Sequence, residues 1–242
     1  MNIGVIFAGG VGSRMHSKER PKQFLEMYSK PILVHTLEHF EVNSDIDAIV
    51  IACVKEWIPH LEQMLHKFRI SKVRKIVQGG TTGQLSIYNG LLAAKQIAQN
   101  EKAVVLIHDG VRPLITSKLL TENILSVQKW GSAITSGIVK ETIVEIDDES
   151  FVEQVPSREK ARVAKAPQSF WLEDILKVHQ QALSESRENF IDSCTLMKHY
   201  GHQLHMVDGP YENIKITTPD DFYTMRAILE AKENAQIYGL ED

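Results

Sequence analysis

A glycine-rich segment followed by two basic residues is the part of the chain that most directly suggests chemistry. Three glycines stand within four positions, at Gly9, Gly10 and Gly12, directly after an apolar run. Glycine lets backbone N–H groups approach a ligand closely, and several converging N–H groups bind an anion, usually a phosphate. Arg14 and Lys22 are close enough in the sequence for a single loop to bring both to the same ligand, where they would add positive charge. The segment therefore predicts a polyphosphate site, and the alternative is a run of solvated surface cations.

Two well-known phosphate-binding motifs do not fit this segment. A dinucleotide-binding fingerprint that began at Gly10 would need glycine or alanine where the chain has Met15. A P-loop would need lysine and then serine or threonine after its last glycine, but Ser13 and Arg14 follow Gly12. We therefore expect the anion to be bound by a different arrangement.

A second segment that could bind a charged ligand is His-Asp-Gly-Val-Arg-Pro at residues 108–113. It follows an apolar run, so Asp109 stands where a strand is expected to end. A carboxylate beside a triphosphate is suited to hold Mg²⁺, which takes one or two carboxylates together with phosphate oxygens and waters. The alternative is an ordinary turn, since Asp-Gly is a common turn dipeptide. Considered together with the glycine-rich segment, the metal is the favoured interpretation.

The elements that must position these residues alternate between short β-branched runs and amphipathic stretches. Four apolar runs predict buried strands, at residues 3–7, 48–54, 73–77 and 103–108. Apolar residues spaced three or four apart predict helices between them, around residues 33–40, 58–68 and 85–92. Such repetition predicts an α/β fold with a doubly wound, mainly parallel sheet. Ligands of such sheets bind beyond the carboxyl ends of the strands, where both candidate segments fall.

The pattern changes after residue 134. Strands are predicted at 134–139, 142–146 and 151–155 around an acidic turn, which is typical of a hairpin arm. A two-stranded ribbon is marginally stable alone, so we expect it to pack on a second subunit in a homodimer. We expect one domain over residues 1–242, with 140–162 as the protruding β-hairpin arm. The remaining predictions are helices at 171–183, 192–200 and 219–235 and a short strand at 214–217.

The composition limits the classes of protein that remain. Hydrophobic residues make up 43% of the 242 residues and charged residues 24%, which suits a globular protein with a sizeable core. The net charge of −4 offers no field for a nucleic acid. Cys53 and Cys194 cannot form a disulfide framework and lack the spacing of a zinc site. No export signal and no apolar run of roughly 20 residues is visible, so we expect a cytoplasmic protein with no membrane partner.

Four segments together resemble the polyol-phosphate cytidylyltransferases, and they follow the family's order along the chain: residues 8–15, 21–24, 108–113 and 213–217. The resemblance implies a Rossmann-like nucleotidyltransferase fold and the transfer of a cytidylyl group from CTP to a polyol phosphate, with Mg²⁺ as cofactor. The products would be a CDP-alcohol and pyrophosphate. The amino acids at positions 110–113 and 214–219 favour D-ribitol 5-phosphate as the acceptor. The alternative acceptor is 2-C-methyl-D-erythritol 4-phosphate.

The resemblance also implies roles for individual residues. Arg14 and Lys22 would steady the triphosphate, Lys215 would contact the α-phosphate, and Asp109 would bind Mg²⁺. Thr142 and Arg158 would reach the acceptor from the neighbouring subunit. The nucleotide site would comprise Ala8, Gly9, Gly10, Gly12, Gly80, Thr81 and Ser86, and the acceptor site Thr142, Arg158, Asp192 and Arg112.

Several of these residues could instead have a purely structural role. Alternation in the run 214–216 is enough to point Lys215 outward without any function. Arg158 could form a surface ion pair with Glu153 or Glu159. Asp192 could simply cap the helix that follows it. The turn at 78–83 could likewise be an ordinary turn that feeds a helix.

The chain departs from the family pattern at positions near the ribose and the polyol. It has Thr81 and Gly83 where many relatives carry an acid and an arginine, Ala166 in place of the threonine of Thr-Pro-Gln, and Ile191 before Asp192. Two other functions are compatible with the segments. One is a nucleotidyltransferase for sugar 1-phosphates that uses UTP, dGTP or GTP, and the other is a nucleotide-binding scaffold without turnover.

Overall fold

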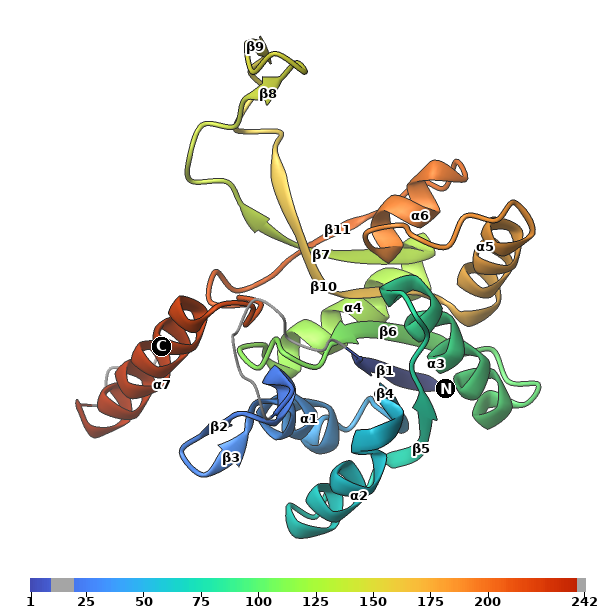
Figure 1. Cartoon of the computed structure of the whole chain (residues 1–242), viewed down its shortest axis with the longest axis vertical. Helices are drawn as coiled ribbons and strands as arrows, with labels where there is room; N and C mark the ends of the chain where they lie inside the picture. Colours follow the sequence, from blue (N-terminus) through green and yellow to red (C-terminus); the bar gives the residue numbers. More distant parts are fainter. Residues whose placement is uncertain (10–19, 239–242) are drawn as a thin grey trace.

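Residues 1–9 and 20–238 are described by a computed structural model, and within them a seven-stranded sheet forms the centre of the protein (Figure 1). The strand order is β11-β7-β10-β6-β1-β4-β5. The strands span β1 (Asn2–Ala8), β4 (Ala48–Cys53), β5 (Val73–Gln78), β6 (Val104–Asp109), β7 (Ser132–Ile138), β10 (Arg162–Trp171) and β11 (Met206–Asp208).

The sheet is mainly parallel, with one reversed strand. β1 pairs in parallel with β4 and β6, β4 with β5, and β11 with β7, whereas β10 runs antiparallel to both of its neighbours. β4 and β6 are buried along their whole length, as expected of strands covered on both faces. The predicted α/β class with a doubly wound, mainly parallel sheet is confirmed. The reversal matters for the site, because it brings the first half of β10 to the edge at which β1 and β6 end.

Helices cover the two faces of the sheet in separate layers, each with its own apolar core. One layer consists of α1 (Ile32–Val42), α2 (Ile58–Lys67) and α4 (Ser117–Trp130), and the other of α3 (Gly83–Ala98), α5 (Leu172–Ser184) and α6 (Ser193–His199). Two of these helices begin at threonine caps: Thr82 accepts a hydrogen bond from the N–H of Leu85, and Thr116 accepts one from Leu119. α4 ends at Gly131, whose φ of +83° suits glycine.

Smaller elements follow β1 and close the fold. After the 3₁₀ turn η2 (Lys22–Phe24) comes the short hairpin β2 (Glu26–Met27) and β3 (Lys30–Pro31), and a second 3₁₀ turn, η3 (Lys55–Trp57), precedes α2. The C-terminal helix α7 (Pro219–Tyr238) packs through Met225 in a third apolar cluster with Met27 and Ile216. In the part of the chain so described, no helix combines the length and apolar character needed to cross a bilayer.

An arm leaves the sheet between β7 and β10 and projects away from it (Figure 1). Within it, β8 (Glu145–Ile146) and β9 (Val152–Gln154) form a small antiparallel pair, and the carboxylate of Asp147 accepts the N–H groups of Glu149 and Phe151 at the turn. The strand predicted at 134–139 belongs instead to the central sheet, as β7. The strands predicted at 142–146 and 151–155 are shorter than expected.

The strand predicted at 214–217 is absent, and the segment is extended chain without a ladder. Its backbone groups have other partners: the N–H of Ile216 donates to the carbonyl of Val111, and the N–H groups of Thr217 and Thr218 donate to the carboxylate of Asp221. The Ile-Lys-Ile alternation is real, because Ile216 is fully buried, but the neighbour is a loop rather than a strand.

Candidate active site

Three charged side chains converge where β6 ends. Nζ of Lys215 lies 2.6 Å from Oδ1 of Asp109, and Nε of Arg112 lies 2.8 Å from Oδ2 of the same carboxylate. The Asp109 side chain is 7% exposed and that of Arg112 is 13% exposed, whereas Lys215 is 39% exposed. The cluster therefore joins a buried carboxylate to one partly buried cation, Arg112, and one more exposed cation, Lys215.

Backbone contacts hold this cluster in place. Gly110 donates its N–H to the carbonyl of Phe7 on β1, and a Cβ at Gly110 would lie 2.8 Å from Cδ1 of Leu33, so a side chain there would require Leu33 to move. Arg112 donates a second hydrogen bond to the carbonyl of Asn213 at 3.1 Å. The hydrogen bond from Ile216 to the Val111 carbonyl fixes the chain beside Lys215. The two segments that resemble the family, 108–113 and 213–217, are thus in direct contact.

The electrostatics of the cluster keep Asp109 ionised. Burial alone raises the pKa of this carboxyl, but the positive charges of Lys215 and Arg112 outweigh that effect, so the pKa of Asp109 lies below its usual range. Its neighbour His108 is fully buried, and burial lowers the pKa of the imidazole to about 4. The ring is neutral at pH 7, and its Nε2 lies 3.1 Å from the carbonyl oxygen of Arg112, to which it donates. His108 therefore braces the turn and adds no charge.

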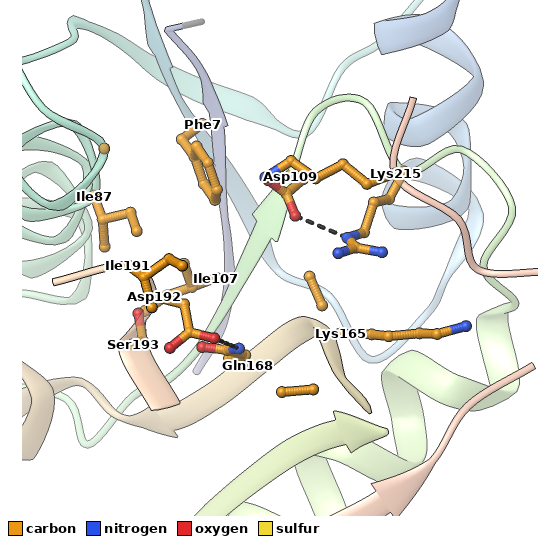
Figure 2. Close-up of a pocket in the computed structure, with 14 residues that line it drawn as sticks. Phe7, Ile87, Ile107, Asp109, Lys165, Gln168, Ile191, Asp192, Ser193 and Lys215 are labelled. Carbon is orange, nitrogen blue, oxygen red and sulfur yellow. Dashed lines mark hydrogen bonds and ion pairs between the residues drawn. The ribbon is translucent and has the colours of Figure 1, made fainter. Parts of the chain in front are cut away.

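A pocket of about 320 Å³ opens beside Asp109. Figure 2 shows Phe7, Ile87 and Ile191 along one side and Asp109, Lys215 and Lys165 along the other. The side that carries Phe7, Ile87 and Ile191 is mainly apolar, with Asp192 at its lower end, and the other side carries the positive charges. Such a division suits a ligand with a flat or aliphatic part and an anionic part.

Candidate nucleotide-binding residues meet at the first turn of α3. Oγ of Ser86 accepts the N–H of Gly80 at 3.0 Å and donates to the carbonyl of Thr82 at 2.9 Å. A Cβ on Gly9 would lie 3.3 Å from the same Oγ, so the end of β1 and the turn after β5 come together at Ser86. Thr81 is exposed on this turn, and Thr82 is the residue that caps the helix. The turn therefore does two things: Thr82 caps α3, and Gly9 and Gly80 come together at Ser86.

Lys22 is brought to the same edge by its neighbours. Nε2 of the buried Gln23 donates a 2.6 Å hydrogen bond to the carbonyl of Ala8, the last residue of β1. Phe24 stacks on Trp57 with 4.9 Å between ring centroids. The 3₁₀ turn that carries Lys22 is therefore fixed to the end of β1. The other candidate cation of the triphosphate site, Arg14, and two of the glycines, Gly10 and Gly12, lie outside the described residues.

Asp192 caps α6 and also lines the pocket. Its Oδ1 accepts the N–H of Thr195 at 2.7 Å, and its Oδ2 accepts from Nε2 of Gln168 at 2.9 Å. Gln168 in turn accepts the N–H of Cys194 at 2.8 Å. Figure 2 shows Asp192 and Gln168 joined at the wall of the pocket. The two interpretations of Asp192 are thus compatible, since one carboxylate caps the helix and faces the pocket.

Thr142 and Arg158 lie on the arm, exposed and apart from the pocket of their own chain. Arg158 donates to the carbonyl of Lys140 at 3.4 Å. Among the described residues it forms no ion pair with Glu153 or Glu159.

The sequence interpretation missed several residues that shape the site. Lys165, Gln168 and Ser193 line the pocket, and Gln23 anchors the turn of Lys22. A signal was present for Gln168, in the Ala-Pro-Gln run, and for Gln23, in the Pro-Lys-Gln-Phe run. Lys165 had no signal, because a single lysine between two alanines belongs to no motif and shows no periodicity.

Comparisons with known proteins cover nearly the whole chain. The family model described as IspD, 2-C-methyl-D-erythritol 4-phosphate cytidylyltransferase, matches residues 3–231. A ribitol-5-phosphate cytidylyltransferase of Streptococcus agalactiae serotype III (strain NEM316) is 53% identical over 240 residues, which is 99% of this chain and 100% of that protein. A 2-C-methyl-D-erythritol 4-phosphate cytidylyltransferase of Clostridium botulinum (strain 657 / Type Ba4) is 37% identical over 229 residues, 95% of this chain and 97% of that protein. The crystal structure of 4-diphosphocytidyl-2C-methyl-D-erythritol synthase from Anaerococcus prevotii is similar with a TM-score of 0.81 and 28% identity, covering 95% of this chain and 96% of that chain.

Proposed function

The chain belongs to the 2-C-methyl-D-erythritol 4-phosphate cytidylyltransferase (IspD) family, and we propose that its acceptor is D-ribitol 5-phosphate. It is a CTP-dependent nucleotidyltransferase that acts on a polyol phosphate, as the sequence segments predicted. The observation that carries the choice of acceptor is the identity of 53% to a ribitol-5-phosphate cytidylyltransferase over its full length, against 37% to a methylerythritol phosphate enzyme. The products are CDP-ribitol and pyrophosphate.

In the proposed reaction an oxygen of the acceptor phosphate attacks the α-phosphorus of CTP. A bond forms between that oxygen and the α-phosphorus, the bond from the α-phosphorus to the bridging oxygen of the β-phosphate breaks, and pyrophosphate leaves. The attacking group is already an anion, so catalysis requires positioning and charge stabilisation rather than a strong base. We assign stabilisation of the triphosphate to Lys22 and Arg14 and contact with the α-phosphate to Lys215. The position of Lys215 beside Asp109, with 39% of its side chain exposed, supports this assignment.

Asp109 is the residue that would hold Mg²⁺. The residues that the structure describes contain no group of three or more His, Cys, Asp or Glu side chains that could hold a metal ion, so Asp109 would not be one member of an all-protein ligand set there. One ionised carboxylate fits Mg²⁺, which takes its other ligands from substrate phosphates and water. Bound there, the ion would neutralise negative charge on the phosphates. Turnover should stop in EDTA and return with added magnesium.

We further propose that the arm completes the acceptor site of a second subunit in a homodimer. Apolar side chains are exposed along it, with Ile146 56%, Phe151 67% and Val152 58% exposed, which favours burial against another surface. The partner subunit's Thr142 and Arg158 would then reach the acceptor phosphate. Light scattering should give a dimer mass, and Arg158→Ala should raise the KM for the acceptor more than that for CTP. A monomer with full activity would contradict this arrangement.

A pyrophosphate-release assay tests the function directly. CTP, UTP, ATP and GTP are each combined with ribitol 5-phosphate, 2-C-methyl-D-erythritol 4-phosphate and glucose 1-phosphate, with and without magnesium. We expect release with CTP and ribitol 5-phosphate. Release with CTP and methylerythritol phosphate alone would replace the proposed acceptor, and release with UTP and a hexose phosphate would replace the nucleotide as well. A protein that releases no pyrophosphate with any pair would be a scaffold.

A further inference from the structure

Lys165 is a basic residue of the pocket whose role the preceding argument leaves open. It lies on β10, between Ala164 and Ala166, and lines the pocket together with Arg112 and Lys215. Figure 2 shows Lys165 on the side opposite Ile87, with its side chain directed away from Asp192 and Gln168. It therefore lies at the end of the pocket that is farther from the candidate nucleotide-binding turn.

The three cations of the pocket differ in their partners. Arg112 and Lys215 both pair with the carboxylate of Asp109. The ammonium of Lys165 instead donates to a neutral group, the carbonyl of Tyr211, at 3.0 Å, and within the described residues it forms no ion pair. Because an ammonium has three N–H donors, Lys165 keeps donors and a full charge for a ligand.

The fold makes room for this side chain. Lys165 crosses strand β7 at Gly137, where a Cβ would lie 2.8 Å from its Cε and 3.2 Å from its Nζ. A side chain at Gly137 would push the end of the lysine aside. The glycine on β7 therefore leaves the space in which Lys165 extends from β10 to the carbonyl of Tyr211.

The charges around Lys165 favour an anion. Burial lowers the pKa of this ammonium, and the positive charge of Arg112 lowers it further, while Glu212 acts in the opposite direction. Two cations that repel one another beside a half-buried pocket are stabilised when a dianion binds between them. A phosphate monoester is such a dianion near neutral pH and accepts several charge-assisted hydrogen bonds.

We propose that Lys165 binds the phosphate of the acceptor, together with Arg112, and so selects for a phosphorylated polyol. The inference rests on the proposed function, because it takes the acceptor to be a polyol phosphate. The acceptor is favoured over the triphosphate of CTP because Lys165 lies across the pocket from Ile87, the neighbour of Ser86 on α3. Lys165 and Arg112 would share the acceptor phosphate with the partner subunit's Thr142 and the partner subunit's Arg158, and the oxygen that faces the α-phosphorus would attack.

The test compares Lys165→Met with a matched control, Lys129→Met. Lys129 is exposed on α4 outside the pocket, and its Nζ lies 4.7 Å from the centroid of the Trp130 ring, so like Lys165 it is a lysine beside an aromatic residue. In Lys165→Met we expect the KM for ribitol 5-phosphate to rise about 10- to 100-fold, as for the loss of one charge-assisted hydrogen bond, and the KM for CTP to change less than about two-fold. Lys129→Met should leave both constants unchanged. Lys165→Arg should recover much of the lost affinity, because it restores the charge.

Two results would overturn the proposal. One is an acceptor KM in folded Lys165→Met within about two-fold of the wild type, and the other is a CTP KM that rises as much as the acceptor KM. A purely structural lysine would instead lower the unfolding temperature in Lys165→Met with no difference between the two substrates.

Calorimetry separates this proposal from the proposed function. Ribitol 5-phosphate, 2-C-methyl-D-erythritol 4-phosphate and unphosphorylated ribitol are titrated into the wild type and Lys165→Met in the presence of CTP with calcium in place of magnesium. One outcome is that the wild type does not turn over ribitol 5-phosphate but binds 2-C-methyl-D-erythritol 4-phosphate more tightly than Lys165→Met does. The proposed acceptor would then be wrong, and the role of Lys165 in binding the acceptor phosphate would be supported. Equal binding of ribitol and ribitol 5-phosphate by the wild type would sink the role of Lys165.

Discussion

Replacing Asp109 by asparagine tests how the site is held together. The change keeps the shape of the side chain but removes the charge that pairs with Arg112 and Lys215 at 2.8 and 2.6 Å. Loss of one partner of a buried ion pair costs about 3–5 kcal/mol. Lys215 can turn to solvent because it is 39% exposed, and Arg112 keeps its hydrogen bond to Asn213, so we place the loss at or just below the lower end of that range.

We therefore expect Asp109→Asn to lower the free energy of unfolding at pH 7 by about 2–3 kcal/mol, or the unfolding temperature by about 4–12 °C for a chain of this size. Lys215→Met should cost about 1 kcal/mol or less, since that cation is more exposed. Urea unfolding measures both. Glu122→Gln is the control, because it breaks a surface pair with Lys118 and should change stability by less than about 0.5 kcal/mol.

The pH dependence of the same variant checks the electrostatic cause. A carboxyl whose pKa is lowered in the folded state stabilises the protein above its ordinary pKa of about 4, and that contribution is lost as the pH falls through the folded-state value. The gap between wild type and Asp109→Asn should thus narrow below about pH 4. A variant within about 0.5 kcal/mol of the wild type at pH 7, or a gap that persists unchanged in acid, would refute the reasoning.

Three further changes probe other parts of the molecule. Lys22→Ala should reduce turnover by about 100-fold or more with the fold intact, and near-normal turnover in a well-folded variant would remove Lys22 from the mechanism. Gln23→Leu leaves the carbonyl of Ala8 without its 2.6 Å hydrogen-bond donor. We expect the free energy of unfolding in urea to fall by about 1–3 kcal/mol and the KM for CTP to rise above that of the wild type. An unchanged KM for CTP would show that this hydrogen bond does not position Lys22. His179 stacks on Tyr88, and burial lowers the pKa of its ring to about 4 from 6.5, so the unfolded chain binds the extra proton and the wild type loses stability as the pH falls between these values. His179→Phe should match the wild type at pH 7 and exceed it by about 2 kcal/mol at pH 5; equal losses in acid would assign the pH dependence to other groups.

Periodic apolar patterns made half of the fold predictable. The β-branched runs that became β1, β4 and β6 are almost wholly buried, so their sequences carry no polar alternation to confuse them with other elements. β5 was predicted as a buried strand, but it is the edge strand of the sheet, and Arg74 and Lys75 in it are exposed. β10 was not predicted, because the part of it that lines the pocket contains Lys165 and Pro167 instead of an apolar run. α4 was missed although Leu120, Ile124 and Val127 have helical spacing, with a threonine cap and a terminal glycine.

The site was predictable only where short motifs carried it. The family resemblance, which is confirmed, pointed to Asp109 and Lys215 from residues about a hundred positions apart, and the structure places them in contact. Neither composition nor periodicity could show that Lys165 crosses β7 at a glycine, since that depends on which strands are neighbours. The prediction of a strand at 214–217 was wrong for the same reason, because it also depended on which segments are neighbours. An alternating pattern indicates which side chains are buried, but it does not indicate whether a strand or a loop covers them.

The pairing of Ile138 with Arg162 places the two ends of the arm on neighbouring strands. Chain inserted between such ends adds only a closure entropy that grows by about 0.6 kcal/mol for each doubling of its length. The length of this segment can therefore change at little cost to the stability of the sheet. An engineer could exchange the tip of the arm, between β8 and β9, while keeping Thr142 and Arg158 in place.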